Sequence, residues 1–249
     1  YALESSLRKG AGQVRVTAVR DVSNGLTVLN DSLEKIQSAV ESSLMIGFFT
    51  EGRYGSCSTN STDPAQIDKL IDQALASVRL LATDPCRTLV PASIRYNGPP
   101  SQMAHKGEIS TGEKKSLLFE CAAGVLGKEL SLISVTADYS DYRRRVQLMD
   151  STGLDCTSEE TWYSLSAECA VKGEGDTRPS DWEYSAGFLP SAVGLGSGIP
   201  SDYALRALHR ALAKRNPGKI RSGRYSAVVE NRVASTLLGP VIQAVSGSS

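Results

Sequence analysis

The stretch Ile133-Ser134-Val135-Thr136-Ala137-Asp138-Tyr139 decides the fold class, because apolar and polar residues alternate along it. A period of two sends successive side chains to opposite faces of a β-strand, so this stretch predicts a strand with one buried face. The same alternation returns in two later segments, at Val146 and Leu148 and then at Tyr163, Leu165, Ala167, Cys169 and Val171. Together the three segments predict an antiparallel meander.

Helices are predicted on both sides of this meander. Ser110 and Glu113 have the spacing of a capping box, in which each residue satisfies a free backbone N–H at the start of a helix. Residues 201–216 form a second helical pattern, which Pro217-Gly218 ends. The apolar residues of the first of these helices are Leu117, Cys121, Ala122 and Val125.

The amino-terminal part of the chain shows a similar order of elements. Residues 1–9 predict the end of a helix, and residues 14–18 alternate as a strand. Asn24-Gly25 is a strong hairpin signal into the next apolar run. The residues that follow are ambiguous, because helical spacing is present at Leu33, Ile36 and Val40.

A buried strand is predicted at residues 44–50, and a helix begins after it at Asp63-Pro64. Asp63 suits the N-cap, Pro64 the first helical position, and Gln66 the place three residues on. One face of this helix carries Ile67, Leu70, Ile71, Ala74, Val78 and Leu81. The segment from 84 to 110 is irregular and rich in Pro and Gly, which makes it the best candidate linker.

These patterns predict an α+β fold of two helix, antiparallel sheet, helix units, which hints at a structural duplication. The expected division is residues 1–90 for the first unit, residues 91–109 for the linker and residues 110–249 for the second unit.

A short strand and a last helix are predicted in residues 222–246. Tyr225, Ala227 and Val229 alternate with Ser226, Val228 and Glu230, which suits a short strand. Asn231 is a reasonable N-cap for the helix. Pro240 removes one backbone donor and should kink or interrupt that helix. Its apolar face would carry Val233, Leu237, Leu238, Val241, Ile242 and Val245.

Composition excludes a strong overall electric field. The chain has 27 Lys plus Arg and 27 Asp plus Glu, so nothing draws it as a whole to nucleic acid or to an anionic membrane. No window approaches the roughly 18 apolar residues of a membrane span, and we expect a cytoplasmic protein with no membrane partner. The chain has five widely spaced cysteines, which are Cys57, Cys86, Cys121, Cys156 and Cys169. Their odd number and the lack of any C-x-x-C predict reduced thiols.

Single motifs give little support to an independent active site. His105 and His209 share no metal-binding spacing, and His209 fits a solvated helix face. The glycines of residues 194–198 precede a helix, but they lack the G-x-G-x-x-G and Gly-Lys-Ser/Thr patterns, so a flexible loop is favoured over a phosphate site. Arg143-Arg144-Arg145 lies near aromatic residues, which can bind single-stranded nucleic acid. A salt-bridged sheet surface is favoured, because alternate side chains of a strand point to opposite faces.

Several segments together resemble the TldD/PmbA family, whose members are also called modulators of DNA gyrase. They are, in order, Lys9-Gly10-Ala11-Gly12, Glu51 to Asn60, Ala82-Thr83-Asp84-Pro85, Tyr139-Ser140-Asp141, Asp150-Ser151-Thr152-Gly153-Leu154 and Ser222 to Val229. No single segment is decisive, and the shared order carries the resemblance. The resemblance favours a strand for residues 33–40. It also implies that the chain is an amino-terminal portion that leads into a missing carboxy-terminal half.

The family comprises two sister subunits, and the resemblance implies which of the two this chain is. The TldD-type sister carries HExxxH after a Leu-Leu pair; its two His bind zinc and its Glu can serve as general base toward a metal-bound water. Here Leu237-Leu238 is followed by Gly239, Pro240 and, five places after Gly239, Ala244. The resemblance therefore implies the PmbA/TldE type, with no catalytic residue, no metal ligand and no cofactor of its own. Zinc is expected only in the sister.

The leading hypothesis is a non-catalytic subunit that assembles with a TldD-like, HExxxH-bearing sister to process or degrade unstructured peptides. An isolated subunit can also pair with itself as a homodimer, and no specific nucleic acid is expected. The alternative is a regulatory or binding protein, like a modulator of DNA gyrase, with no protease role. A third hypothesis is a stand-alone hydrolase that uses a Cys or Ser, although no G-x-S-x-G is present.

Overall fold

Two segments, residues 1–216 and residues 217–249, fold as separate units in the computed structural model. The structure describes residues 1–95, 98, 102–195 and 201–246. The first unit contains the sheet and most of the helices, and the second contains the helix α5 (Asn231–Val245).

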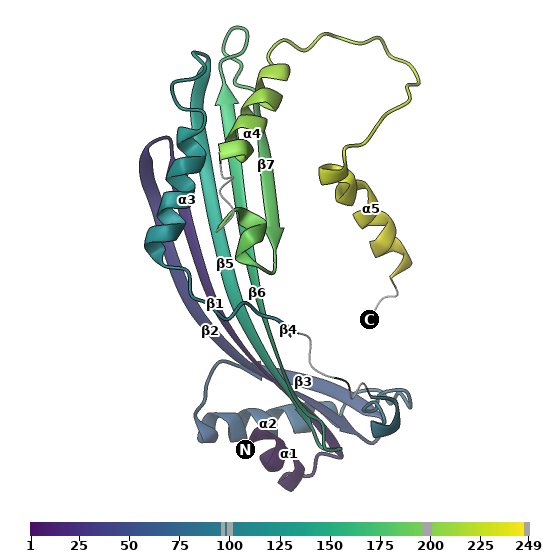
Figure 1. The fold of residues 1–249 in the computed structure, drawn as a ribbon. Coiled ribbons are helices and arrows are strands. Elements are labelled where there is room, and N and C mark those ends of the chain that lie inside the picture. The colour runs from purple at the N-terminus through teal and green to yellow at the C-terminus, as the bar shows by residue number, and fades with distance from the viewer. Residues whose placement is uncertain (96–97, 99–101, 196–200, 247–249) are drawn as a thin grey trace. The chain divides into compact units, whose positions relative to one another are not determined.

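The first unit presents one order of elements twice (Figure 1). The first series is α1 (Ala2–Arg8), β1 (Gln13–Leu29), β2 (Ser32–Thr50), β3 (Arg53–Thr59) and α2 (Pro64–Val78). The second series is α3 (Thr111–Ala123), β5 (Leu132–Asp150), β6 (Asp155–Val171), β7 (Ser180–Gly187) and α4 (Ser201–Ala213). Shorter elements are η1 (Ala92–Ile94), β4 (Gln102–Met103) and η2 (Pro190–Val193). The predicted α+β class and the helix, sheet, helix order are confirmed.

Both series of strands belong to one sheet. The strand order is β3-β2-β1-β5-β6-β4, with β7 also paired to β6, and all pairs are antiparallel except β4 with β6. Strands β1 and β5 join the two series through a register that runs from Arg15 opposite Asp150 to Leu29 opposite Thr136. The sequence boundaries at 1–90, 91–109 and 110–249 stay a prediction about how the chain is divided.

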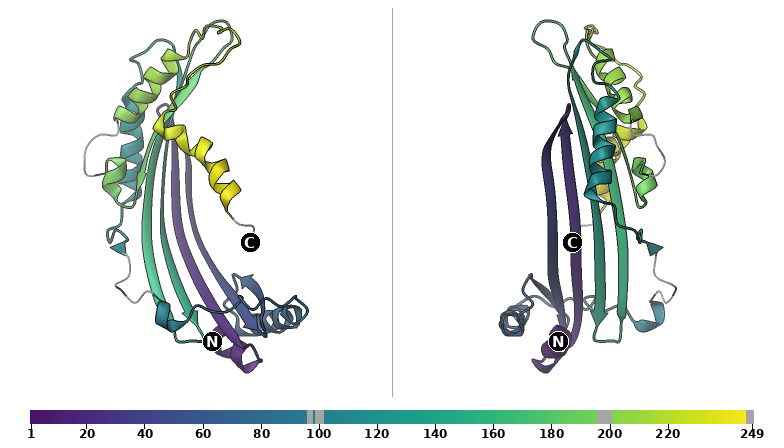
Figure 2. Two further views of the ribbon diagram at one scale, coloured as in Figure 1. Left: turned by 90° about the vertical axis from the view of Figure 1, so that its right-hand side faces the viewer. Right: turned by 60° about the vertical axis from the view of Figure 1, so that its left-hand side comes forward.

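Two hydrophobic cores lie toward the two ends of the sheet, one with α1 and α2 and the other with α3 and α4 (Figures 1 and 2). Val14 and Val16 of β1 pack with α1 and α2, while Leu26 and Val28 pack with α3 and α4. All four have even numbers, so they belong to one face of the strand, and the right-handed twist of a long strand turns this face along its length. Between the two cores, Arg20 of this face is exposed.

The predicted N-caps Asp63 of α2 and Ser110 of α3 are confirmed. The Asp63 carboxylate accepts a hydrogen bond from the backbone N–H of Ala65, with Pro64 at the first helical position of α2. The Ser110 hydroxyl accepts from the N–H of Glu113, and the Glu113 carboxylate accepts from the N–H of Ser110. These reciprocal bonds form a complete capping box.

The hairpin prediction at Asn24-Gly25 is wrong. Gly25 lies inside β1, opposite Gln37 of β2 and Ser140 of β5, so pairing on both sides overrides the local turn preference. The chain turns instead after Leu29, where Asn30 adopts a φ of 55°. This left-handed conformation is one that Asn tolerates. Residues 33–40 lie in β2, as the family resemblance predicted. The helical spacing of Leu33, Ile36 and Val40 was misleading.

In the second unit the predicted short strand is also wrong, since residues 217–230 contain no strand. The helix after them is confirmed, but Glu230 and not Asn231 occupies the N-cap, and the helix continues through Pro240 without interruption. Its apolar side chains are exposed, and they are Val233, Leu237, Leu238, Val241, Ile242 and Val245.

Candidate functional site

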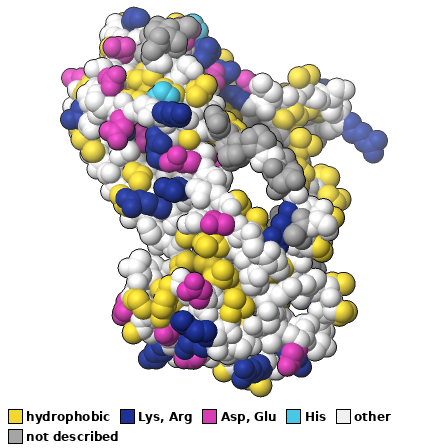
Figure 3. Space-filling model, turned by 60° about the horizontal axis from the view of Figure 1, so that its bottom comes forward, with side chains coloured by type: hydrophobic (Ala, Val, Ile, Leu, Met, Phe, Trp, Pro, Cys, Tyr) yellow, Lys and Arg dark blue, Asp and Glu magenta, His cyan; other side chains and the backbone are white. Residues whose placement is uncertain are grey.

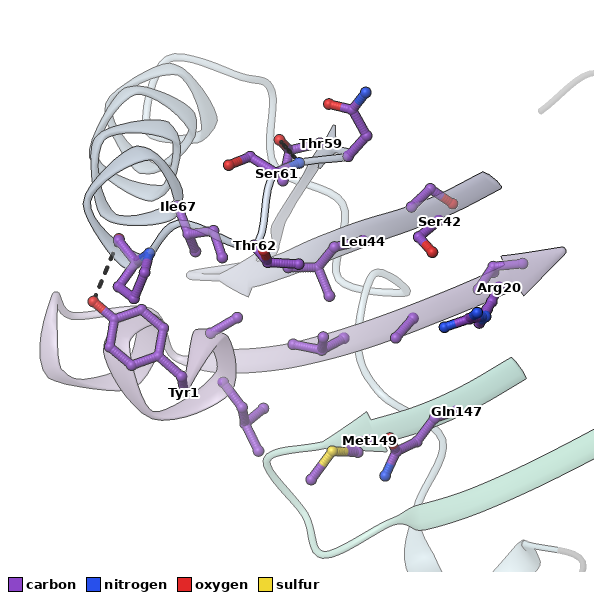
Figure 4. A pocket seen from close by; sticks show the side chains of 18 of the residues that line it. Tyr1, Arg20, Ser42, Leu44, Thr59, Ser61, Thr62, Ile67, Gln147 and Met149 are labelled. Carbon is purple, nitrogen blue, oxygen red and sulfur yellow. Dashed lines mark hydrogen bonds between the residues drawn. The ribbon is translucent and has the colours of Figure 1, made fainter. Parts of the chain in front are cut away.

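An open pocket of about 490 Å³ lies in the first unit, on the sheet face beside α1 and α2 (Figure 4). Its apolar lining includes Val16, Ala18, Leu44, Ile67 and Met149. Much of the remaining lining consists of hydroxyl and amide side chains, which are Ser42, Ser43, Thr59, Asn60, Ser61, Thr62 and Gln147. An apolar surface with a few polar groups that fix orientation is typical of ligand pockets.

Three adjacent strands place the lining side chains in rows. Leu44 of β2 is opposite Ala18 of β1, which is opposite Gln147 of β5. One row further from α1, Arg20 stands between Ser42 and Arg145. Residues two apart along a strand share a face, so both rows point into the same pocket.

The far row contains both charged side chains that line this pocket. Arg20 and Arg145 are directly opposite each other in the β1–β5 register, and both are exposed. Neither makes an ion pair or a hydrogen bond with another described residue. Like charges in directly opposite positions of a sheet destabilise it, so this pair is electrostatically unfavourable in the unliganded protein.

The other arginines of the 143–145 run are occupied. Arg144 lies on the opposite face and donates to both carboxylate oxygens of Asp21, at 2.8 and 2.9 Å. This bond holds the pKa of Asp21 below its usual value. Arg143 donates to the His105 carbonyl at 2.6 Å and to Glu159 at 3.4 Å. The prediction of a salt-bridged surface is therefore right for Arg143 and Arg144 and wrong for Arg145.

Arg20 was not among the residues that the sequence singled out. No local pattern marks it, because its importance comes from the register that brings it to Arg145. The only available indication was its even-numbered position in the strand that begins with Val14 and Val16. That periodicity places Arg20 on the face that is buried at both ends of β1.

The family resemblance aligns Gly239, Pro240 and Ala244 with the HExxxH positions of the sister, and the structure places all three on α5. None of these side chains has an oxygen, nitrogen or sulfur atom that could hold zinc. The space around Gly239 is open, with nothing within 4 Å of the position a Cβ would take. Their correspondence to the zinc-binding positions of the sister subunit stays a prediction.

The other predicted candidates do not gather into a site. The ring of His105 lies edge-on to that of Tyr163, with 6.3 Å between centroids, and His209 is exposed on α4. Across the described ranges, no group of three or more His, Cys, Asp or Glu could hold a metal ion. Gly194 ends η2 with a φ of 85°, and the rest of that glycine loop, from residue 196, lies outside the described residues.

Burial distinguishes the five free thiols. Cys121 and Cys169 are buried in the core under α3 and α4, and burial raises the pKa of Cys121 to about 11 and that of Cys169 to about 12. Burial also raises the pKa of Cys57. A thiolate is the nucleophilic form, so these three positions are poor nucleophiles. Cys86 and Cys156 are exposed.

None of the helices in the described part of the chain is long and apolar enough to cross a membrane.

The fold and the pocket define an α+β scaffold with a helix layer at each end of a sheet face and a binding surface between them. Residues 14–78 match the PmbA/TldA metallopeptidase domain 1, and residues 104–215 match the PmbA/TldA metallopeptidase central domain. The chain belongs to the PmbA/TldD family.

Related proteins agree with this assignment. Metalloprotease PmbA of Escherichia coli O157:H7 is 23% identical over 251 residues, which cover 100% of this chain and 54% of that protein. The Metalloprotease PmbA homolog of Haemophilus influenzae is 21% identical over 256 residues, again covering 100% of this chain and 54% of the relative. The chain therefore spans about half the length of the curated relatives it matches.

Solved structures share the fold. A Bacteroides thetaiotaomicron protein, described as a candidate modulator of DNA gyrase, superposes with a TM-score of 0.86 at 29% identity, over 98% of this chain and 55% of its own. TldE of Thermococcus kodakarensis superposes with a TM-score of 0.66 at 15% identity, over 85% of this chain and 47% of its own.

Proposed function

We propose that this chain is part of a non-catalytic, PmbA/TldE-like subunit of a zinc metalloprotease that processes or degrades unstructured peptides. The observation that carries the proposal is the sequence after Leu237-Leu238 on α5, where Gly239, Pro240 and Ala244 have no metal-binding or proton-transferring group. A TldD-like sister with HExxxH would supply the zinc, which activates a water for attack on the peptide bond. The compartment we propose is the cytoplasm.

The pocket supports a role in holding peptide. Its apolar residues can accept a side chain, and its hydroxyl and amide groups can bond to an extended backbone. Such groups bind without moving protons, which suits a subunit that positions a substrate for a partner's chemistry. The relatives named metalloproteases support the same class of function.

The regulatory alternative rests on the description of the Bacteroides thetaiotaomicron neighbour. Sequence-independent DNA binding needs a patch of unpaired Lys and Arg that neutralises several phosphates. Seen from the end of the first unit that carries α1 and α2, basic side chains are interspersed with acidic ones (Figure 3). The two unpaired arginines of the pocket are too few for such a patch, so the peptide-processing proposal is favoured.

Assembly and metal content test the proposal together. The full-length protein and its HExxxH-bearing sister should copurify, with about one zinc per sister and none attributable to this subunit. Replacing a sister His should remove the zinc and leave the complex assembled. Stoichiometric zinc in the purified PmbA/TldE-like protein alone would refute the non-catalytic assignment.

A further inference from the structure

We infer that the pocket binds the carboxy-terminal end of a peptide, with the terminal carboxylate between Arg20 and Arg145. This inference rests on the proposed peptide-processing function and names the part of the substrate that this subunit recognises.

The charges that line the pocket favour an anionic ligand. Its lining side chains include Arg20 and Arg145 and no acid. Glu159 is opposite Arg145 in the β5–β6 register, but its carboxylate pairs with Arg143 at 3.4 Å. Asp141, on the same sheet face, is paired with a lysine. The nearby acids are thus already engaged, while the two opposed guanidinium groups remain without a described partner.

The chemistry of the pair selects a carboxylate. Guanidinium groups are planar donors that match the two oxygens of a carboxylate, and bonds between charged groups are the stronger hydrogen bonds of proteins. Two guanidinium groups on adjacent strands can each bind one carboxylate oxygen, and the bound anion would also relieve their mutual repulsion. Arg20 and Arg145 therefore select a negatively charged ligand and fix where its carboxylate binds.

The uncharged part of the pocket selects what is attached to that carboxylate. Ile67 belongs to α2 and Leu44 packs in the same cluster, whereas Arg20 lies further along the sheet (Figure 4). An apolar side chain can rest on Leu44 and Ile67 while the carboxylate of the same residue reaches the arginines. The volume of about 490 Å³ suits a short peptide end. This combination fits an apolar carboxy-terminal residue better than an acidic side chain inside a longer peptide.

The test uses three fluorescent unstructured peptides. The first ends in Leu with a free carboxylate, the second ends in Leu with a carboxy-terminal amide, and the third ends in Asp with a carboxy-terminal amide. Each is titrated into the full-length protein. We expect the free acid to bind about tenfold to 100-fold more tightly than the amide, as charged hydrogen bonds would give. The double variant Arg20→Gln with Arg145→Gln should reduce that ratio to within about twofold.

Arg144→Gln is the matched control, because Arg144 neighbours Arg145 in sequence but points to the opposite face and binds Asp21. It should retain the preference for the free acid, and melting curves should show that both variants fold. Equal binding of acid and amide, tight binding of the Asp amide, or an unchanged preference in the double variant would overturn the inference. If the complex with the sister still cleaves peptides in those cases, the proposed function survives. A carboxylate preference without any cleavage would overturn the proposed function alone.

Discussion

The Lys114 ammonium of α3 lies 2.5 Å from a carboxylate oxygen of Asp141 on β5, and both side chains are almost fully buried. Asp141 also accepts hydrogen bonds from the Asn24 amide and the Tyr139 hydroxyl, both at 2.8 Å. Burial and the neighbouring Asp141 raise the pKa of Tyr139, which therefore stays a neutral donor. These contacts tie α3 to two adjacent strands, next to the uncovered middle of the sheet face.

Lys114→Met should strongly destabilise the protein, because it leaves the Asp141 charge buried without its partner. Breaking a buried ion pair costs about 3–5 kcal/mol, which denaturant unfolding can measure. Lys115→Met is the control on the same helix, since Lys115 is only partly buried and has no ion pair among the described residues. Equal losses for the two variants would show that the ion pair has no special role.

Asp150 should make stability depend on pH. Burial alone would raise its pKa, but bonds from Thr152 and Leu154 and the charge of Arg95 outweigh burial and lower it. A carboxylate whose pKa is lower in the folded state stabilises the protein above its unfolded pKa, and this contribution is lost as pH falls through the folded pKa.

Asp150→Asn should therefore lower the free energy of unfolding at pH 7, and its deficit should shrink below about pH 4, where unfolded Asp is protonated. Asp176→Asn, in an exposed loop, provides the control. Unfolding curves across this pH range would contradict the account if the Asp150→Asn deficit were the same at every pH.

Removing one charge of the opposed arginine pair should stabilise the unliganded protein. Arg20→Gln relieves repulsion from Arg145, and cross-strand pair effects are about 0.2–1 kcal/mol. The melting temperature at low salt should rise slightly, and the gain should diminish as salt screens the charges. Arg144→Gln, which breaks the ion pair with Asp21, should produce no gain. A loss of stability in Arg20→Gln would mean that an unseen partner compensates its charge.

Thiol labelling tests how burial distinguishes the five cysteines. A thiol reagent should modify Cys86 and Cys156 quickly, Cys57 slowly, and Cys121 and Cys169 only after unfolding, because burial removes access and raises the pKa. Mass spectrometry after timed labelling identifies the modified positions. Rapid labelling of Cys121 or Cys169 in the folded protein would contradict the packing of the core under α3 and α4.

Local chemistry made the starts of α2 and α3 predictable. The Asp63 cap and the Ser110–Glu113 box bring together groups within a single helical turn, so the sequence contains everything they need. Asn24-Gly25 failed for the opposite reason. Its turn preference is local, but the pairing that keeps Gly25 extended comes from Gln37 and Ser140 on two other strands.

The candidate site depended on register in the same way. Arg20 and Arg145 belong to different halves of the chain, and only the pairing of β1 with β5 brings them together. The sequence predicts that the side chains of residues 143–145 alternate between the two faces of the strand. It does not predict which of these arginines forms an ion pair with an acidic residue. The sequence alone shows that Gly239, Pro240 and Ala244 have no metal-ligating group, because that property depends only on their side chains.

Peptide cleavage by the reconstituted pair tests the central claim most directly. The full-length protein, its HExxxH-bearing sister and their mixture are each given an unstructured peptide, and cleavage is followed by mass spectrometry. The account predicts cleavage only in the mixture, abolished by chelation and by replacing the sister's Glu while the complex remains assembled. Cleavage by the PmbA/TldE-like protein alone, or equal cleavage by the sister without it, would contradict the proposal of a non-catalytic but necessary subunit.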